Sequence, residues 1–328
     1  MVEVRAPLIE VVLATHNGVR FLEEQILSID RQTLRPQRLL ISDDQSTDGT
    51  LELIQRLVQN FGPWLVLLPP SSQRLGCVAN FARLLVATSA PYVALADQDD
   101  VWLPNKLELS FMALSKLEVA YGKEAPLLVH TDLTLIRSSG TMISPSYLSY
   151  QRIDPERSSS TYLSLTNVVS GCTVLLNRSC VVRSSPLPPQ AAMHDWWLAL
   201  VAAEFGAISC CQQSTVLYRQ HVGNTVGATG IGWRYWLDRV MHLVSSLKSW
   251  PLGPLLPGIA QRAYFEHHFG LPSSALVSIF QYPRLRRFVY LPRLPRMHGP
   301  LRQLAFLCLV LLLPKCRFNL EPVSCATQ

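Results

Sequence analysis

Short apolar runs alternate with amphipathic stretches over the first hundred residues. The apolar runs have no internal polar alternation and are rich in leucine and β-branched residues, a pattern typical of strands that are buried on both faces. They cover residues 8–14, 39–41, 64–68 and 92–96. Between them, apolar residues recur at three- and four-residue spacing, which predicts helices. These helices cover residues 19–32, 46–61 and 80–88.

This order of elements predicts an α/β fold. Buried strands joined by helices form a central, mostly parallel sheet with right-handed crossovers and with helices on its faces. After Pro104 the alternation weakens. The elements predicted there are helices over residues 105–121 and 195–205, and strands over residues 127–131, 168–176 and 215–218.

Beyond residue 230 the chain changes character. Amphipathic helices are predicted over residues 233–247 and 301–313, separated by proline-rich segments. We therefore expect a domain over residues 1–230 and a helical extension over residues 231–328. The longest apolar run, Leu304–Leu313, has ten residues, whereas a helix that crosses a bilayer needs about 20. A core helix or an interfacial helix is expected there.

Charge divides the chain at the same place. Residues 1–230 carry 17 basic and 20 acidic side chains, whereas residues 231–328 carry 12 basic and 3 acidic ones. A charged fraction of only 16% excludes a disordered chain. A basic extension on a slightly acidic body predicts an anionic partner, either a membrane surface or a nucleic acid.

The eight cysteines and the first residues indicate the compartment. No pair of cysteines has CxxC spacing, which excludes a zinc ribbon and a thioredoxin-like motif. In a chain of this length we interpret them as reduced thiols. The first residues lack the apolar segment and the small-residue cleavage site of a signal peptide. We expect a cytoplasmic protein.

Polar residues follow three of the predicted strands. The clusters are Thr15-His16-Asn17-Gly18, Asp43-Asp44 and Asp97-Gln98-Asp99-Asp100. One such cluster is usually a turn or a helix cap, but three in successive units meet at the sheet edge where α/β proteins bind ligands. Asp97 and Asp99 alternate along an extended segment and can face one cation, and their hard oxygen atoms suit Mg²⁺ or Mn²⁺. The chain has neither a GxGxxG nor a GxxxxGK[ST] sequence, which disfavours a Rossmann dehydrogenase and a P-loop enzyme.

These clusters resemble the motifs of family-2 glycosyltransferases with the GT-A fold. The matching segments, in the family's order, are residues 11–18, 41–50 and 97–102. They look like the bacterial rhamnosyltransferase-like branch, which builds surface polysaccharides. The similarity extends over residues 8–225, about two thirds of the chain, and is more specific for the family than for the sugar.

The resemblance implies a role for each matching residue. The residues expected around the nucleotide donor are Thr15, Asn17, Asp43, Asp44, Arg74, Asn80, Asp97 and Arg219. Asp97 and Asp99 match the family's DxD motif, so Asp99 with Asp97 would hold the metal that bridges the donor diphosphate. His221 lies in a closing segment and would ligate the metal or the diphosphate. Asp195 falls where the family keeps its general base.

Two positions depart from the family pattern. His16 stands where tyrosine is usual, and Gln45 stands where glycine is usual. Both lie at the nucleoside pocket, so they bear on the choice of base rather than on the fold.

Three residues are candidates for the acceptor site. His130 and Asp132 follow the apolar residues 127–129 and either line that site or belong to a hydrogen-bonded core. The face of Trp196 suits a sugar ring, but Trp196 and Trp197 must point in different directions on a helix, so one of the two is expected in the core.

The sequence therefore predicts an inverting, metal-dependent glycosyltransferase. It would move a sugar of the rhamnose type from a dTDP- or UDP-sugar to a lipid-linked saccharide, with Asp195 accepting the proton of the acceptor hydroxyl and Mg²⁺ or Mn²⁺ stabilising the leaving diphosphate. One alternative is a sugar-nucleotide pyrophosphorylase, which would need a basic glycine-rich loop after the first strand. Another is a non-catalytic nucleotide-sugar-binding scaffold at the membrane, against which the intact set of Asp97, Asp99 and Asp195 argues.

The extension interleaves aromatic and cationic side chains. Two such stretches cover residues 233–242 and 284–296. This mixing is typical of a membrane interface, whereas an acidic, donor-binding body disfavours a nucleic acid as the partner. We expect a peripheral protein at the cytoplasmic face of the membrane. The alternative is a small helical domain that packs on the catalytic one.

Overall fold

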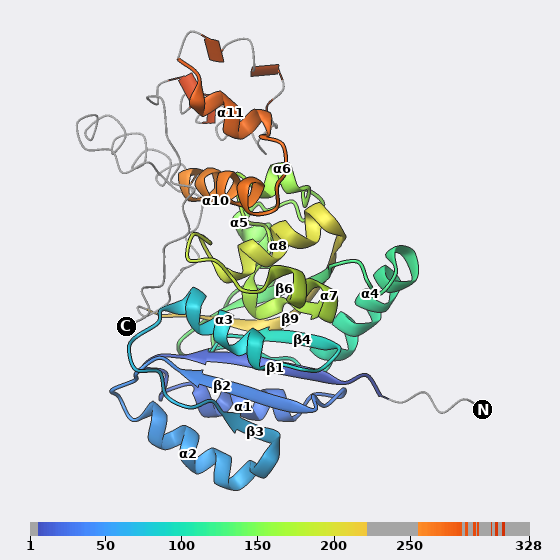
Figure 1. The fold of residues 1–328 in the computed structure, drawn as a ribbon. Coiled ribbons are helices and arrows are strands. Elements are labelled where there is room, and N and C mark those ends of the chain that lie inside the picture. The colour runs from blue at the N-terminus through green and yellow to red at the C-terminus, as the bar shows by residue number, and fades with distance from the viewer. Residues whose placement is uncertain are drawn as a thin grey trace.

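A computed structural model of the chain describes residues 6–221, 255–283 and individual positions between 286 and 311. Within these residues a nine-stranded sheet runs through the molecule, with helices on both faces (Figure 1). The strand order is β3-β2-β1-β4-β8-β6-β9-β5, and β7 pairs with β6. The α/β fold predicted from the sequence is confirmed.

The N-terminal half of the sheet is parallel, as predicted. Its strands are β1 (Ile9–Thr15), β2 (Arg38–Asp43), β3 (Leu65–Leu67) and β4 (Tyr92–Ala96). The helices between them are α1 (Leu22–Asp30), α2 (Thr50–Phe61) and α3 (Cys77–Ala87). In the register, Thr15 of β1 lies opposite Asp43 of β2, so the polar clusters that follow these strands come to one edge.

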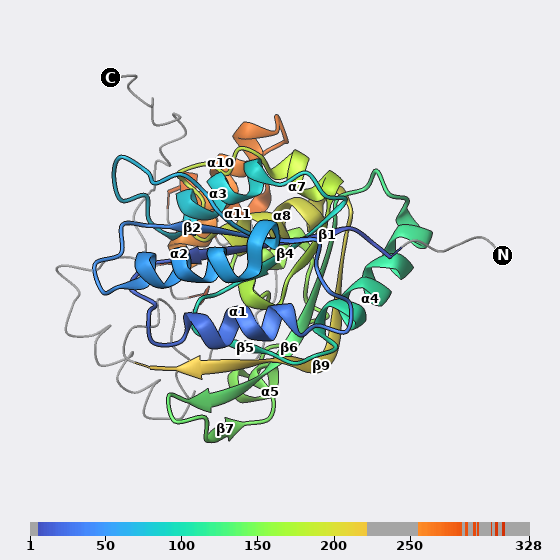
Figure 2. The same cartoon turned by 90° about the horizontal axis from the view of Figure 1, so that it is seen from below.

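The C-terminal half of the sheet has mixed directions. Its strands are β5 (Val101–Trp102), β6 (Leu127–Arg137), β7 (Met142–Ser144), β8 (Leu175–Asn177) and β9 (Ala207–Gln220). Only the pair β6 and β9 is parallel, whereas β8 runs antiparallel to both β4 and β6, and β5 runs antiparallel to β9. Figure 2 shows β7 and the short helix α5 (Tyr147–Gln151) beside β6 and β9, in this mixed half of the sheet.

All three strands predicted in this half have the wrong extent. The one over residues 127–131 is only the start of β6, which continues to Arg137. The apolar run 168–176 is buried, but it is a strand only from Leu175, because Gly171–Thr173 forms a 3-10 turn in which the Val174 N–H donates to the Gly171 carbonyl. The strand predicted over 215–218 is the end of the 14-residue β9. The middle of β9 is polar and exposed at Gln212 and Gln213, which interrupts the apolar pattern between its first residues and residues 215–218.

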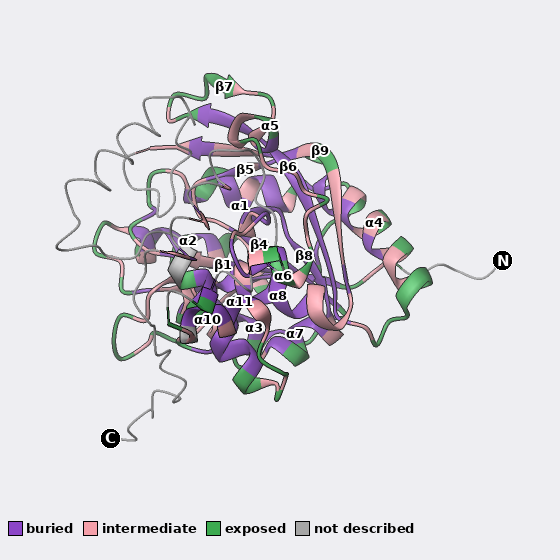
Figure 3. Ribbon diagram, turned by 90° about the horizontal axis from the view of Figure 1, so that it is seen from above, coloured by how far each residue is buried: buried purple, intermediate pink, exposed green. Residues whose placement is uncertain are grey.

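Both faces of the sheet are covered, which explains why β1 is apolar at successive positions. Val11 and Leu13 pack in an apolar cluster with residues of α1 and α2, whereas Val12 belongs to a second cluster on the other face. That second cluster contains residues of α3, α7 (Arg178–Ser184) and α8 (His194–Phe205). Figure 3 shows the strands as the most continuously buried part of the molecule.

The described part of the extension packs on the domain. Helix α10 (Leu255–His268) lies beside α8 and α6 (Ser160–Leu163). It packs so closely there that a Cβ atom at Gly258 would lie 2.7 Å from the Trp196 ring. Phe265 packs edge-on against Trp197, with 5.2 Å between ring centroids. The next helix is α11 (Ala275–Gln281), and the buried Arg287 ties it to the last described helical segment by donating to the carbonyls of Tyr282 and Val310.

The two helices predicted for the extension have different outcomes. The one over residues 233–247 lies outside the described residues. In the one over residues 301–313, the described positions are helical; they are Gln303, Phe306, Leu307, Val310 and Leu311. None of the helices in the described part of the chain is long and apolar enough to cross a membrane.

Candidate active site

Asp43 organises the turn that follows β2. The Thr15 hydroxyl donates to Asp43 Oδ1 at 2.9 Å, and Ser46 donates to the same carboxylate from its backbone N–H at 2.9 Å and its hydroxyl at 2.5 Å. The neighbouring Asn17 accepts a hydrogen bond from the Thr47 N–H at 2.8 Å. These bonds join the ends of β1 and β2 into one rigid edge.

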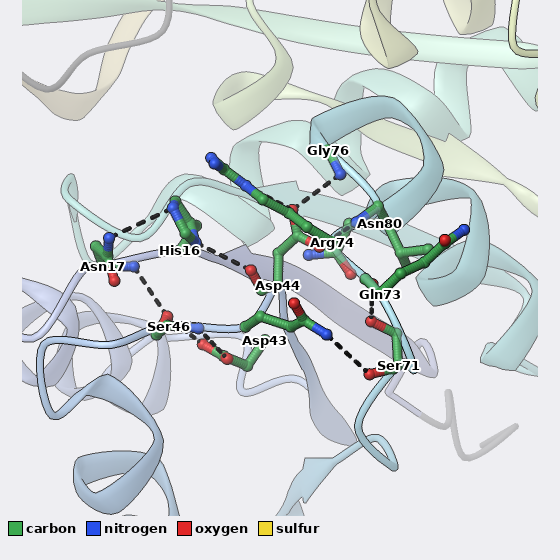
Figure 4. Close-up of polar contacts among 12 residues, drawn as sticks. His16, Asn17, Asp43, Asp44, Ser46, Ser71, Gln73, Arg74, Gly76 and Asn80 are labelled. Carbon is green, nitrogen blue, oxygen red and sulfur yellow. Dashed lines mark hydrogen bonds and ion pairs between the residues drawn. The ribbon is translucent and has the colours of Figure 1, made fainter.

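Asp44 fixes a second loop over this edge (Figure 4). Its carboxylate is 4% exposed and accepts the backbone N–H groups of Leu75 at 2.6 Å and Gly76 at 2.9 Å. The exposed Arg74 side chain lies beside it, with Nε 3.8 Å from Asp44 Oδ2. Behind the loop, the buried Asn80 amide donates to the Ser42 carbonyl at 3.0 Å. The residues of β1, β2 and α3 that the sequence predicts around the nucleotide-sugar donor thus lie close together.

The two unusual positions of this pocket have structural explanations. His16 Nδ1 lies 3.0 Å from the Asp44 carbonyl oxygen, which can only accept, so Nδ1 carries the proton. Gln45 has a φ of 60°. That left-handed conformation favours glycine, which explains why the family pattern has glycine there. Asn17, at a φ of 51°, is a residue type that tolerates this region.

A cluster of carboxylates follows β4. Burial, together with the charges of Asp99 and Asp195, raises the pKa of Asp97 to about 7. The pKa of the fully buried Asp100 is raised well above its ordinary value by burial and by the charges of Asp97 and Asp99. Oxygen atoms of Asp97 and Asp100 lie within 4.8 Å of each other and of Cys172 Sγ. The cluster therefore concentrates negative charge away from bulk water.

Asp195 joins this cluster from the start of α8. It is 8% exposed, and the Trp196 N–H donates to its Oδ1 at 2.7 Å. Burial raises the pKa of Asp195 to about 6, against the opposing effect of hydrogen bonds from Trp196, from the Gly171 N–H and from the Asn167 side chain. A carboxylate with this pKa is largely ionised at neutral pH and can accept a proton.

The end of β9 closes the cluster from the other side. His221 Nε2 lies 2.7 Å from Asp99 Oδ2. Arg219 is 5% exposed, and its guanidinium donates to the Asp99 carbonyl at 3.0 Å and to Glu24 at 2.7 Å, while its backbone N–H donates to Asp100 Oδ1 at 3.2 Å. Arg219 therefore holds the Asp97–Asp100 turn in place.

The remaining predicted residues lie in more closed surroundings. His130 is 1% exposed, and burial lowers its pKa to about 4. Asp132 Oδ1 accepts the N–H groups of Leu133, Tyr147 and Leu148, so it caps the start of α5. Trp196 donates from its indole nitrogen to the Leu163 carbonyl, and Trp197 is the core residue of the tryptophan pair.

Two residues that shape the site were missed by the sequence analysis. Gly171 donates to Asp195, and a side chain at Gly171 would come within 3.0 Å of His194 Nε2 and 3.4 Å of Asp195 Oδ2. Lys106, at the start of α4 (Lys106–Tyr121), is wholly buried near Asp100 and Cys172. The spacing of residues gives some indication of this burial: residues 106, 110 and 114 lie on one helix face, and Ser110 and Leu114 are buried as well.

Known proteins share both the motifs and the fold. Residues 10–123 match the model of Glycosyl transferase family 2. The chain carries a family-2 glycosyltransferase domain. It is 25% identical over 228 residues to the dTDP-rhamnosyl transferase RfbG of Shigella flexneri, covering 66% of this chain and 74% of that protein. The match to this family model and the likeness to a curated glycosyltransferase confirm the enzyme class that the sequence predicts.

Two further comparisons agree. The chain is 23% identical over 208 residues to the UDP-Glc:alpha-D-GlcNAc-diphosphoundecaprenol beta-1,3-glucosyltransferase WfgD of Escherichia coli, covering 62% of this chain and 74% of that protein. Among solved structures, the mannosyltransferase PcManGT from Pyrobaculum calidifontis in complex with GDP-Man and Mn²⁺ has a TM-score of 0.51 at 16% identity. That match covers 94% of this glycosyltransferase and 86% of the other chain. The fold of the family thus extends well beyond the residues that carry its sequence motifs.

Proposed function

We propose that this glycosyltransferase transfers a sugar from a nucleotide donor to a saccharide acceptor, in a metal-dependent reaction that inverts the anomeric centre. The observation that carries the proposal is the convergence of Asp195 with Asp97 and Asp99. Asp195 comes from a helix about a hundred residues away in sequence, yet its charge raises the pKa of Asp97. A single displacement requires a proton acceptor for the attacking hydroxyl close to the groups that stabilise the leaving diphosphate.

The donor nucleoside would bind at the edge formed by β1, β2 and α3. Asp43 and Asp44 are held there by the hydrogen bonds described above. Thr15, Asn17 and Asn80 lie along the same edge. Arg74 supplies an exposed cation beside Asp44. In this assignment Asp44 and Arg74 contact the nucleotide, while Asp43 mainly keeps the pocket in shape.

The carboxylate cluster suits a divalent cation. Oxygen atoms are the preferred ligands of Mg²⁺ and Mn²⁺, and the raised pKa of Asp97 indicates negative charge in need of compensation. Asp97 and Asp99 would hold the cation, with His221 next to Asp99. Cys172 lies beside Asp97 and Asp100, but its sulfur is a softer ligand than Mg²⁺ or Mn²⁺ prefers, so we leave it out of the proposed ligand set. When bound, the cation would stabilise the negative charge of the leaving diphosphate.

Asp195 would act as the general base. Its hydrogen bonds from Gly171 and Trp196 fix the carboxylate at the start of α8, where the helix dipole favours the ionised form. It would take the proton from the acceptor hydroxyl as that oxygen attacks the anomeric carbon on the face opposite to the diphosphate. His130, Asp132 and Trp196 stay proposed as residues around the acceptor.

The likeness to RfbG and WfgD supports dTDP- or UDP-sugars as donors, rhamnose as one candidate sugar, and a lipid-linked saccharide of a surface polysaccharide as the acceptor. A lipid-linked acceptor would fit a membrane-bound enzyme. We propose that residues 233–242 and the basic residues of 284–296 other than the buried Arg287 meet anionic lipid at the cytoplasmic face of the membrane, because cations and aromatic rings interleave there.

The test is a panel of dTDP-, UDP- and GDP-sugars with Mg²⁺, Mn²⁺ or EDTA, with products on a lipid-linked acceptor identified by mass spectrometry. Asp195→Asn should keep donor affinity within about twofold and lower kcat by at least about a hundredfold, because it removes the base alone. Asp30→Asn, at an exposed surface ion pair, is the matched control and should leave both unchanged.

Three results would contradict the proposal. They are near-normal transfer by Asp195→Asn, full activity in EDTA, and binding of donors without transfer to any acceptor. The last would identify a nucleotide-sugar-binding scaffold instead.

A further inference from the structure

The start of α8 carries Asp195 and is in contact with α10 on both sides of that residue. Before Asp195, the Ala192 N–H donates to the side-chain oxygen Oε1 of Gln261 at 2.6 Å. After Asp195, the Trp196 ring packs so closely against α10 that Gly258 has no room for a side chain. A helix of the extension therefore fixes the backbone that presents Asp195.

The contact with Trp196 reaches Asp195 through a single residue. The Trp196 N–H donates to Asp195 Oδ1 at 2.7 Å, and its indole nitrogen donates to the Leu163 carbonyl. A Cβ atom at Gly258 would also lie 2.7 Å from the Ser164 carbonyl oxygen. The close approach of α10 to this backbone requires a glycine. The Trp196 ring is thus held between α10 and the end of α6, and the same residue supplies an N–H to Asp195.

A third contact leads to Asp195 by another route. Ile259 of α10 and Leu165 are both buried and belong to one apolar cluster. Leu165 stands two residues before Asn167, whose side chain is hydrogen-bonded to Asp195. Helix α10 therefore packs against two separate segments that donate hydrogen bonds to the Asp195 carboxylate.

Gln261 is an unusual side chain for the buried face of a helix. It is 0% exposed, and its Nε2 has no hydrogen-bond partner among the described residues. A buried amide with an unused donor lowers the stability of a protein, whereas an apolar side chain of similar length would not. What Gln261 does, and a methionine could not do, is accept the Ala192 N–H.

We propose that Gln261 and Gly258 are positioning residues that hold Asp195 in place for proton transfer, Gln261 through Ala192 and Gly258 through Trp196. This inference rests on the proposed role of Asp195 as the general base. It deepens that proposal because part of the geometry of the base then comes from the extension and not from residues 1–230. Neither positioning residue touches the donor or the acceptor in this assignment.

The experiment is a double-mutant cycle in the full-length chain between Gln261→Met and Asp195→Asn, with the dTDP-, UDP- or GDP-sugar that gives the most product in the panel. Gln261→Met should lower kcat on the order of tenfold, because a small displacement of a catalytic group is costly, and should leave the Kd of that sugar nucleotide within about twofold. In the Asp195→Asn background the base is already absent. The same substitution should therefore change the residual rate by less than about twofold.

Two variants serve as controls. Gln261→Glu keeps an oxygen that can accept the Ala192 N–H, so it should keep kcat within about threefold. His267→Met, at an exposed position of the same helix, should change neither kcat nor Kd. Gln261→Met itself should melt within about 4 °C of the unaltered protein, since it loses one hydrogen bond but also removes the amide donor that has no partner.

Gly258→Ala is the second variant and replaces Gln261→Met in the cycle if that protein does not fold. Its Cβ atom would displace the Trp196 ring, so the same selective loss of kcat is expected. Unchanged kcat in the variant used would overturn the proposal. An equal loss of rate with and without Asp195, or a parallel loss of donor affinity, would overturn it too, because either indicates a general structural defect. Near-normal transfer by Asp195→Asn alone would instead refute the proposed base, so the two failures are distinguishable.

Discussion

The two halves of the site treat carboxylates in opposite ways. At the nucleoside edge, Asp43 and Asp44 accept hydrogen bonds from backbone and hydroxyl donors that hold each oxygen in place. In the cluster after β4, Asp97, Asp100 and Asp195 crowd together in buried surroundings, and their pKa values are raised. The carboxylates of the first half are held by hydrogen-bond donors of the protein, whereas those of the second half raise one another's pKa.

This difference fits the role proposed for each half. A pocket that recognises a nucleoside gains from being rigid before binding, because less ordering is left to occur on association. A cluster that binds a cation gains from uncompensated charge, because the cation then relieves repulsion as it binds. Folding free energy is lost in the second half, and the dense hydrogen bonding of the first half helps to offset it.

The largest expected effect comes from Asp97→Asn. The amide removes one of three crowded negative charges, so the melting temperature in EDTA at pH 7.5 should rise, although transfer should fall by at least about a hundredfold because a proposed metal ligand is lost. Thermal unfolding and initial rates with the best donor of the panel test both parts. A lower melting temperature would contradict the view that these carboxylates repel one another.

The same exchange of aspartate for asparagine at the nucleoside edge should lower the stability of the protein instead of raising it. Asp44→Asn leaves one of the N–H groups of Leu75 and Gly76 without a good acceptor, which should destabilise the protein by about 1–3 kcal/mol. The Kd for the nucleoside diphosphate should rise as the loop loosens. Denaturant titration and calorimetry measure the two effects.

Arg74→Ala is the control for Asp44→Asn. The Arg74 side chain is 64% exposed and 3.8 Å from Asp44, so its loss should weaken nucleotide binding but change stability by less than about 0.5 kcal/mol. If Asp44→Asn were as stable as the unaltered protein, the hydrogen bonds to Leu75 and Gly76 would not be what holds the loop.

The sequence was informative where local pattern and position agree. Buried strands followed by polar residues predicted the parallel half and its edge, because strand ends that share a register must lie side by side, as Thr15 and Asp43 do. The meeting of Asp195 with Asp97 followed only from the family resemblance. Nothing local in the sequence reports a contact across a hundred residues.

The failures have a common physical cause. Residues 168–176 looked like a strand because they are apolar and buried, but their backbone turns at Gly171 to bring its N–H to Asp195. Lys106 is polar and stands at a helix start, yet it is wholly buried, with its ammonium nitrogen 3.8 Å from the centre of the Trp102 ring, and only the spacing of buried residues along its helix hints at this. In both cases tertiary electrostatics at the site outweighed local preference.

The pH dependence of stability in EDTA separates the two kinds of carboxyl group within one protein. Folding raises the pKa of Asp97 to about 7 and that of Asp195 to about 6. The folded protein therefore holds protons that the unfolded chain releases, and the stability that these two groups contribute should fall as pH rises from about 4 to about 7.

Glu10 acts in the other direction. Burial raises its pKa, but hydrogen bonds from Ala90, Arg38 and Ser89 outweigh burial and lower it below the ordinary value of 4.5, so the stability that Glu10 contributes is lost as pH falls below that value. The melting temperature should therefore be highest near pH 5 and decline by several degrees toward pH 7.5, at about 2–4 °C per kcal/mol. Asp97→Asn should flatten this decline, and Mn²⁺ should reverse it. A melting temperature that rises steadily from pH 5 to pH 7.5 in EDTA would show that the cluster is not short of positive charge, and the contrast between the two halves would not hold.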